Sequence, residues 1–381
     1  MGSFANTSDG EVDDFIRLSL GGSEVKIAES YDITSSYLSQ PSQFSLRLGS
    51  ADIAADIINA ARPNTRFQLQ VGKYPQMTGT VDGFDVDSSH SGTTVAIHGR
   101  DVSAPLHDAY VDAETSFTDA TYLALTAKVL KRAGITANVY GDNDSNRQIM
   151  TSTTVRTAGK PSTGGQVSHQ VHAKLGERWL HFLRRHLDRA GLFITATAEG
   201  DFVLSRPNSK QPALARIVRK RGQPSEASNV TRARWRVDTS HRYSEVQIYS
   251  RAGGKKFGRG KFLSGFDDPA MAAYGITRPL VLRDKQCTNA TEAEFMARRY
   301  IAQAGREGVR LEYTLRGHSA PSLISGGGRA VWAIDTMVEV DDDELGIHEP
   351  YWVESVHFNR PPTTTTISLV RVADLVFGAD E

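Results

Sequence analysis

Residues 176–207 read GERWLHFLRRHLDRAGLFITATAEGDFVLSRP and combine a helix with a β-hairpin. Apolar side chains recur at helical spacing over residues 179–190, so the pattern predicts an amphipathic helix. Gly191 is placed to end that helix in the left-handed conformation. Residues 192–205 then predict two antiparallel strands around an acidic glycine turn. Pro207 ends the second strand because it has no N–H to donate to a ladder.

Strands dominate the chain on both sides of this stretch. Residues 15–105 contain several segments of period-two alternation separated by glycine turns, which predict a short barrel or a sandwich. Residues 213–262 and 309–371 alternate in the same way. A helix is expected between them, and Thr291 and Glu294 have the spacing of a capping box at its start. No internal repeat is visible in the sequence, although two strand-rich regions around a mixed one hint at a duplicated barrel.

Two segments have the composition of irregular structure. Residues 142–174 are rich in Ser, Thr, Gly, Asn and Gln, which predicts a flexible insertion within a mixed α/β domain at 106–212. Residues 251–261 form a basic, glycine-rich stretch that predicts a mobile surface loop.

This order of elements resembles the baseplate hub family of contractile-tailed phages, also called late-control D proteins, which has Mu-like and T4-like members. The helix–hairpin stretch at 176–207 carries the resemblance, together with Gly-Arg-Asp at 99–101 and Tyr-Trp-Val-Glu-Ser-Val at 351–356. The resemblance covers residues 15 to 375 in the family's order. The departures from it are the insertions around residues 145–174 and 251–261.

The resemblance implies an α+β, mainly β fold. It comprises two tube-protein-like β-barrel domains, at 15–105 and 213–381, which flank the smaller mixed α/β domain at 106–212. The second barrel would carry a loop and helix insertion at 251–306. A polar arm at 1–14 would precede the first barrel.

Composition limits the class of protein. The 381 residues include 44 Lys and Arg and 44 Asp and Glu, so the formal net charge is zero, which disfavours a dedicated nucleic-acid binder. The one cysteine, Cys287, excludes intrachain disulfides and multi-cysteine zinc sites. No apolar run is long enough to span a bilayer, and residues 1–14 lack the plan of a signal peptide. We therefore expect a soluble, cytoplasmically made protein.

The candidate ligand sites fail on spacing. A phosphate-binding loop around Gly260 and Lys261 lacks the required upstream glycine, and Phe262 stands where a hydroxyl is needed. His181 and His186 are five residues apart on the helix, so they point in different directions. His169 and His172 fall in the polar insertion. We expect no metal and no cofactor.

No catalytic motif is found either. The acidic run at 341–344 reads as a solvated turn without the spaced acceptors of a calcium loop. Nucleophile-elbow and zinc-protease motifs are absent from the sequence. The sequence therefore predicts a protein that is not an enzyme.

The most informative charges are Arg232, Arg234 and Arg236, which share one face of a predicted strand. The arginines could face solvent, or they could contact an acidic partner subunit. A third interpretation is that they bind nucleic acid, which the zero net charge disfavours. Residues 216–221 could extend this basic surface. We take the three arginines as a candidate subunit interface and expect Trp235, on the opposite face, to anchor the strand in the barrel core.

The resemblance implies a structural function. Three copies would form a ring that joins the hexameric tail tube to the trimeric central spike and encloses part of the DNA conduit. The expected partners are a homotrimer of this chain, tail tube protein, central spike protein, and further the tape measure protein and other baseplate subunits. Nucleic acid would be a partner only in transit, and no membrane is expected.

The expected location is the virion, after assembly in the host cytoplasm. The alternatives are a hub-like protein with a lytic, peptidoglycan-hydrolysing role sited at 106–212, and the hub region of a secretion-system spike protein. A long C-terminal β-prism repeat would mark the last class, and the sequence shows none.

Overall fold

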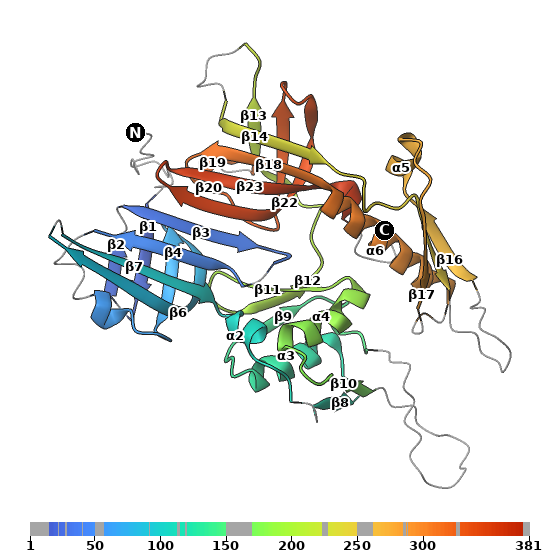
Figure 1. Cartoon of the computed structure of the whole chain (residues 1–381), viewed down its shortest axis with the longest axis horizontal. Helices are drawn as coiled ribbons and strands as arrows, with labels where there is room; N and C mark the ends of the chain where they lie inside the picture. The colour runs from blue at the N-terminus through green and yellow to red at the C-terminus, as the bar shows by residue number, and fades with distance from the viewer. Residues whose placement is uncertain are drawn as a thin grey trace, which may run out of the picture.

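The computed structural model describes most of the chain (Figure 1). The described residues are 15–21, 23–26, 29–39, 41–49, 57–90, 92–112, 115–118, 120–149, 170–222, 228–249, 262–284, 287, 289–324 and 328–375. The predicted arm at 1–14 and most of the two predicted insertions, at 150–169 and 250–261, lie outside them. Among the described residues, no helix combines the length and apolar character that a transmembrane helix requires.

The N-terminal strands form a group that we call the first unit. Five of its strands are adjacent in space in the order β3-β4-β7-β6-β5. Alternate buried and exposed side chains along β4 and β5 match the sequence pattern that predicted them. The bounds are β3 Ser30–Ser36, β4 Gln43–Leu48, β5 Arg66–Val71, β6 Tyr74–Ser89 and β7 Gly92–Asp101, with β1 Ile16–Leu20 and β2 Ser23–Lys26 beyond β5.

The C-terminal strands form a second unit with the same order, β14-β18-β23-β22-β21. In this comparison β14 corresponds to β3, β18 to β4, β23 to β7, β22 to β6 and β21 to β5. Both units carry a one-residue irregularity at the same point, at Asp82 in β6 and at Glu354 in β22. The bounds are β14 Val230–Val237, β18 Val309–Arg316, β21 Met337–Asp342, β22 Ile347–Arg360 and β23 Thr364–Arg371, with β13 Ala213–Arg219 paired to β21.

The two units are joined into one 13-stranded sheet because β3 pairs with β22. We call this pair the inner junction. Side chains of both units also share one buried core, in which Ile33 and Phe358 lie opposite each other. The mainly β character is thus confirmed. The two strand-rich regions are parts of a common sheet and core, and the predicted boundaries of separate domains stay a prediction.

A buried polar group ties the units together beside the inner junction. The hydroxyl of Tyr31 lies 2.6 Å from Nε2 of His318, and Nδ1 of His318 lies 2.9 Å from Oγ1 of Thr365. His318 also packs edge-on against Phe358. Burial lowers the pKa of His318 to about 3, so the ring is neutral at physiological pH.

The mixed region has its own core around the stretch that predicted it. Helix α4, Trp179–Ala190, buries its apolar face, and Gly191 ends it with φ of 68° in the left-handed region. Strands β11 and β12 then form the predicted hairpin. The remaining elements are α2 Ala104–Asp108, β8 Ser116–Thr118, α3 Tyr122–Arg132, β9 Val139–Gly141, β10 Gln170–His172, β11 Phe193–Ala196 and β12 Phe202–Ser205.

A third small core lies between β14 and β18 in the sequence. It consists of a three-stranded sheet packed on the long helix α6, Ala290–Gly308. The helix was predicted, but its cap was not: the side chain of Asn289, and not Thr291, accepts the N–H of Glu292 at 2.8 Å. The other elements are β15 Glu245–Tyr249, β16 Phe262–Asp267, α5 Pro269–Ala273, β17 Pro279–Arg283, β19 Ser319–Pro321, β20 Arg329–Val331 and the 3-10 turn η2 Val372–Asp374.

Candidate subunit interface

Strand β14 carries the three predicted arginines and lies at one end of the large sheet. Within the described part of the chain, β18 is its only ladder partner. Arg232, Arg234 and Arg236 are all exposed and share one face, as the sequence predicted. Arg236 bonds Asp238 at 3.0 Å, whereas no such partner is found for Arg232 or Arg234 among the described residues. The unpaired side of β14, residues 231–237, is called the Arg edge below.

The opposite face of β14 corrects the sequence prediction. Trp235 was expected in the core, yet 51% of its surface is exposed, and Val237 is 44% exposed. Only the beginning of the strand is packed inside, with Val230 buried and Ala233 half-buried against the core. The alternation correctly placed Trp235 on the same face as Ala233. The later part of β14 extends past the core, so no described residue covers Trp235 there.

A side-chain clasp just before β14 holds the chain against β13. Asn229 Oδ1 accepts the backbone N–H of Val218 at 2.9 Å, and Asn229 Nδ2 donates to the backbone oxygen of Arg216 at 2.8 Å. The amide side chain therefore links this residue to the backbone of β13, although the two strands share no ladder. After it, the outer side of β14 is unpaired among the described residues.

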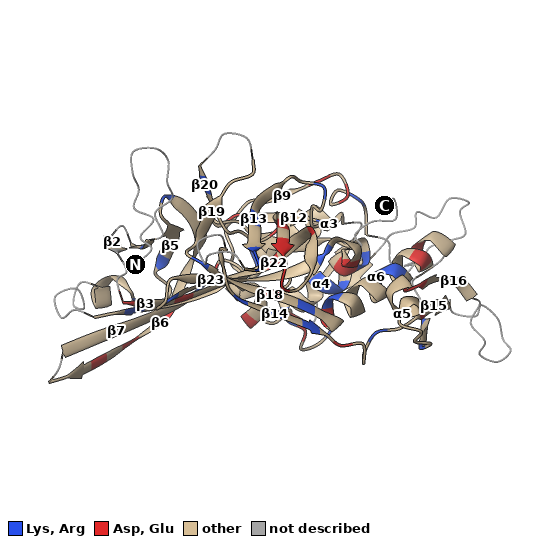
Figure 2. Cartoon of the chain, turned by 90° about the horizontal axis from the view of Figure 1, so that it is seen from above, with Lys and Arg blue, Asp and Glu red and all other residues tan. Residues whose placement is uncertain are grey.

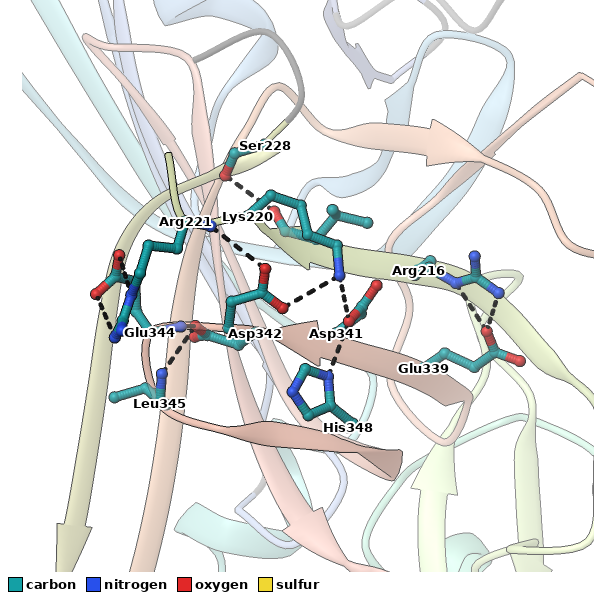
Figure 3. Close-up of polar contacts among 12 residues, drawn as sticks. Arg216, Lys220, Arg221, Ser228, Glu339, Asp341, Asp342, Glu344, Leu345 and His348 are labelled. Atoms are coloured by element: carbon teal, nitrogen blue, oxygen red, sulfur yellow. Dashed lines mark hydrogen bonds and ion pairs between the residues drawn. The ribbon is translucent and has the colours of Figure 1, made fainter. Parts of the chain in front are cut away.

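The basic segment upstream does not extend the Arg edge, which corrects a second expectation. Figure 3 shows that its side chains face the acidic strand β21, with which β13 pairs in parallel. Arg216 Nε lies 2.8 Å from Glu339, and Lys220 Nζ lies 2.7 Å from Asp341 and 3.2 Å from Asp343. These cations are thus neutralised within the chain.

The acidic turn at 341–344 is also more structured than predicted. Asp342 is fully buried and accepts a hydrogen bond from the Tyr313 hydroxyl at 2.9 Å. It also accepts the backbone N–H groups of Glu344 and Leu345 (Figure 3). A carboxylate with three donors holds a turn in one conformation. Its role is therefore to fix the turn, and the prediction of a solvated loop was wrong for this residue.

One group of metal-type ligands occurs among the described residues. Carboxylate and imidazole atoms of Asp341, Asp343 and His348 lie within 4.8 Å of one another. The ammonium of Lys220 already contacts both carboxylates, and it holds the pKa of Asp341 below its usual value, with His348 as the next cause. This arrangement is that of a surface ion-pair cluster (Figure 3).

The histidines of α4 do not form a site. His181 is exposed, whereas His186 is buried against Phe182, with ring centroids 5.4 Å apart. Burial lowers the pKa of His186 to about 4. His172 is exposed and bonds Gln170, and His169 lies outside the described residues.

A second unpaired edge was missed by the sequence reading. Strand β6 pairs with β5 only as far as Thr80, and no ladder partner on that side is found for residues 82–88 within the described chain. Asp82 is bound by Arg100, but no bonded partner is found for the exposed Asp85 and Asp87 in the described residues. We call residues 82–88 the acidic edge. The sequence contains a signal for this edge, because Asp85 and Asp87 have the same two-residue spacing as the arginines of β14.

One face of the sheet between these edges is polar. From β14 to β6 the strand order is β14-β18-β23-β22-β3-β4-β7-β6. Figure 2 shows these strands along one side of the molecule, with β13, β12 and β20 on the other. The register places hydroxyl side chains in the middle of the polar face, namely Thr34, Ser36, Ser355, Thr366 and Ser368.

Comparison with known proteins agrees with this architecture. Residues 15–101 match the family model described as Mu phage baseplate assembly protein GpP-like, N-terminal. The 43 kDa tail protein of prophage MuSo2 from Shewanella oneidensis has a TM-score of 0.72 at 22% identity, over 95% of this chain and 99% of that one. The resemblance to phage baseplate hubs is confirmed. A comparison of this hub-like chain with curated proteins gives no match.

Two further solved structures share the fold of the hub-like chain. The tail protein from Neisseria meningitidis MC58 has a TM-score of 0.73 at 20% identity, over 96% of this chain and 98% of that one. A chain of the Francisella PdpA-VgrG complex has a TM-score of 0.52 at 9% identity, over 93% of this chain and 52% of that one. At these identities the likeness is one of fold. Together with the family match, it supports a structural role in a phage tail baseplate.

Proposed function

We propose that this hub-like chain is the structural baseplate hub of a contractile phage tail. Three copies form a ring that joins the hexameric tail tube to the trimeric central spike and encloses part of the DNA conduit. The chain has no catalytic role and needs no cofactor. It functions in the virion after assembly in the host cytoplasm, with tube, spike, tape measure and neighbouring baseplate proteins as partners, and without a membrane.

The observation that carries this proposal is the repeated strand order. The two units share five strands in one order and are already joined edge to edge at the inner junction. A ring of three such chains presents six similar units, which is the symmetry that a hexameric tube requires. In this ring each unit takes the role of the tube-protein-like barrel expected from the sequence.

The polar face of the sheet suits the wall of a conduit. Its central strands β23, β22 and β3 present mainly hydroxyl and amide groups. A wall without a continuous row of cations does not bind the phosphate backbone tightly, because affinity for nucleic acid rises with each neutralised phosphate. Rows of like charge lie instead on the flanking strands, at the Arg edge and the acidic edge.

The test is the mass of the assembly. Light scattering of the purified full-length protein, alone and with its spike protein, should give a trimer in at least one of these samples. A strict monomer or dimer in an assembled particle would end the proposal. Peptidoglycan hydrolysis in a zymogram would revive the lytic alternative, and stoichiometric zinc would contradict the absence of a cofactor.

A further inference from the structure

The two units allow residues to be matched one by one through the strand register. After the irregularity in each unit, Gly83 pairs with His98 in the first and Ser355 pairs with Ser368 in the second. Gly83 therefore corresponds to Ser355. Counting onward along the strands, Val86 of the acidic edge corresponds to Phe358 of the inner junction.

The strand register also matches β14 to β3. His98 and Ser368 also pair with Ser45 on β4 and Glu312 on β18, respectively. Asp32 lies opposite Ser45, and Arg234 lies opposite Glu312. Arg234 thus corresponds to Asp32, and the next residue, Trp235, corresponds to Ile33.

The inner junction shows how such edges meet. Strands β22 and β3 pair antiparallel with Phe358 opposite Ile33, and both side chains are nearly inaccessible to solvent. Their equivalents, Val86 and Trp235, are 44% and 51% exposed. The chain therefore contains one complete junction and the two halves of a second, one on β14 at the end of the sheet and the other on the part of β6 that runs beyond β5.

We propose that the Arg edge of one copy pairs with the acidic edge of a second copy, antiparallel and in the register of the inner junction. This inference rests on the proposed function in one respect, that the chain assembles with itself. The register then fixes four cross-strand pairs between copies, which are Arg234 with Asp87, Trp235 with Val86, Arg236 with Asp85 and Val237 with Phe84.

Every pair fixed in this way is chemically complementary. Two pairs bring an arginine opposite an aspartate, on the polar face. The other two bring apolar side chains together on the face that Ala233 and Phe84 direct toward the core. A shift by one residue in either direction would oppose Trp235 to an aspartate, because side chains alternate between faces. A shift by two residues would keep the charge match, with Arg234 opposite Asp85 and Arg232 opposite Asp87, so the proposed register comes from the inner junction.

The contact is heterologous, since one copy contributes β14 and the other contributes β6. Such contacts close into rings or continue as open filaments. The unpaired backbone groups of both edges become hydrogen-bonded on contact, as they do in strand addition to any exposed edge. The partner is therefore a second copy of this chain.

A disulfide test measures the register directly. The double variant Val86→Cys/Trp235→Cys places thiols at directly opposed positions, where Cα atoms are about 4.5–5.5 Å apart and can be bridged. The matched control Val86→Cys/Ala233→Cys is displaced by two residues, to about 7–8 Å, beyond easy bridging. The native Cys287 is buried and its thiol pKa is raised to about 12, so it does not compete.

We expect oxidation of the first variant to give covalent oligomers on a non-reducing gel, at least about tenfold more than the control gives, as the geometric limits on disulfides require. Equal yields from both variants would overturn the register. Trimers in light scattering without cross-links would overturn this contact and leave the proposed hub function standing. Monomers at every concentration, with tube and spike present and without cross-links, would overturn both.

A charge swap supplies an independent test. Arg234→Asp and Asp87→Arg should each lower the association constant by about tenfold or more, and the double swap should restore most of the loss. The effect of each single reversal should be larger at low salt, where repulsion is unscreened. The control is Arg216→Asp, because Arg216 is also exposed but binds Glu339 of its own chain. A double swap that assembles no better than the weaker single variant contradicts the proposal.

Discussion

Strands β3 and β14 occupy the same place in two units of one strand order, yet their surroundings are opposite. Ile33 on β3 is fully buried against Phe358, whereas the corresponding Trp235 on β14 is half exposed. The difference is not one of local pattern, since both strands alternate. It depends on whether a partner strand is present in the same chain. A strand can therefore have the sequence of a core element and remain exposed until another copy covers it.

The largest effect on the free energy of unfolding should come from a change at the inner junction, where β3 is covered by β22. Phe358→Ala removes a buried aromatic ring at the inner junction and should lower the free energy of unfolding by about 3–5 kcal/mol. Its equivalent on the acidic edge, Val86→Ala, should change it by no more than about 0.5 kcal/mol in the isolated chain. Urea denaturation followed by circular dichroism measures both. Similar losses in the two variants would mean that the edges do not differ as described.

The clasp at the start of β14 should have the next largest effect. Asn229→Ala leaves the N–H of Val218 and the carbonyl of Arg216 without their side-chain partner, which costs up to about 3 kcal/mol. Hydrogen exchange should show faster exchange at Val218 in this variant, with Leu315 on the far side of β14 as the internal control. Unchanged protection at Val218 would show that the clasp does not hold the two strands together.

Acid should also weaken the inner junction, because it protonates His318. Burial lowers the pKa of His318 to about 3, so His318 stabilises the fold fully above its unfolded pKa of about 6.5. This contribution decreases as the pH falls below 6.5 toward 3, and the loss reaches about 2 kcal/mol at pH 5. Denaturation at pH 7 and pH 5 should therefore show a smaller drop for His318→Gln than for the native chain. An equal drop in both proteins would exclude His318 as the cause.

The smallest effect on the isolated chain is expected at Trp235. Because half of its surface is exposed, Trp235→Ala should cost about 1 kcal/mol or less in the monomer. The same change should weaken association, since the ring would be buried between copies. Denaturation at low protein concentration and light scattering at high concentration separate the two effects. A loss of 3 kcal/mol or more in the monomer would place Trp235 in a core after all.

Local patterns in the sequence predicted local structure well. Helix α4, its stop at Gly191 and the hairpin after it followed from spacing alone, because those signals act within a few residues. Most predicted strands are present for the same reason. The cap of α6 was misplaced because two capping side chains, Asn289 and Thr291, stand two residues apart and either could begin the helix.

Long-range pairing could not be predicted in this way. Nothing near β3 indicates that it pairs with β22, and nothing near residues 216–221 indicates that they face the acids of β21. Alternation in β14 specified which side Trp235 would point to, but not whether anything lies there. The arginines were found because three like charges in one strand are conspicuous, while Asp85 and Asp87 form a row of only two in a longer strand.

The inner junction has a consequence for how the protein is made. Tyr31 and its partner His318 are separated by 287 residues. At about 5–20 residues per second, a ribosome needs roughly 15–60 s to deliver the second after the first. During that interval the N-terminal unit has no β22, and β3 is as open as β14 is in the finished chain. A nascent chain can therefore accept the acidic edge of a completed neighbour in the wrong place, so crowding of ribosomes on one message should lower the yield of correctly folded protein.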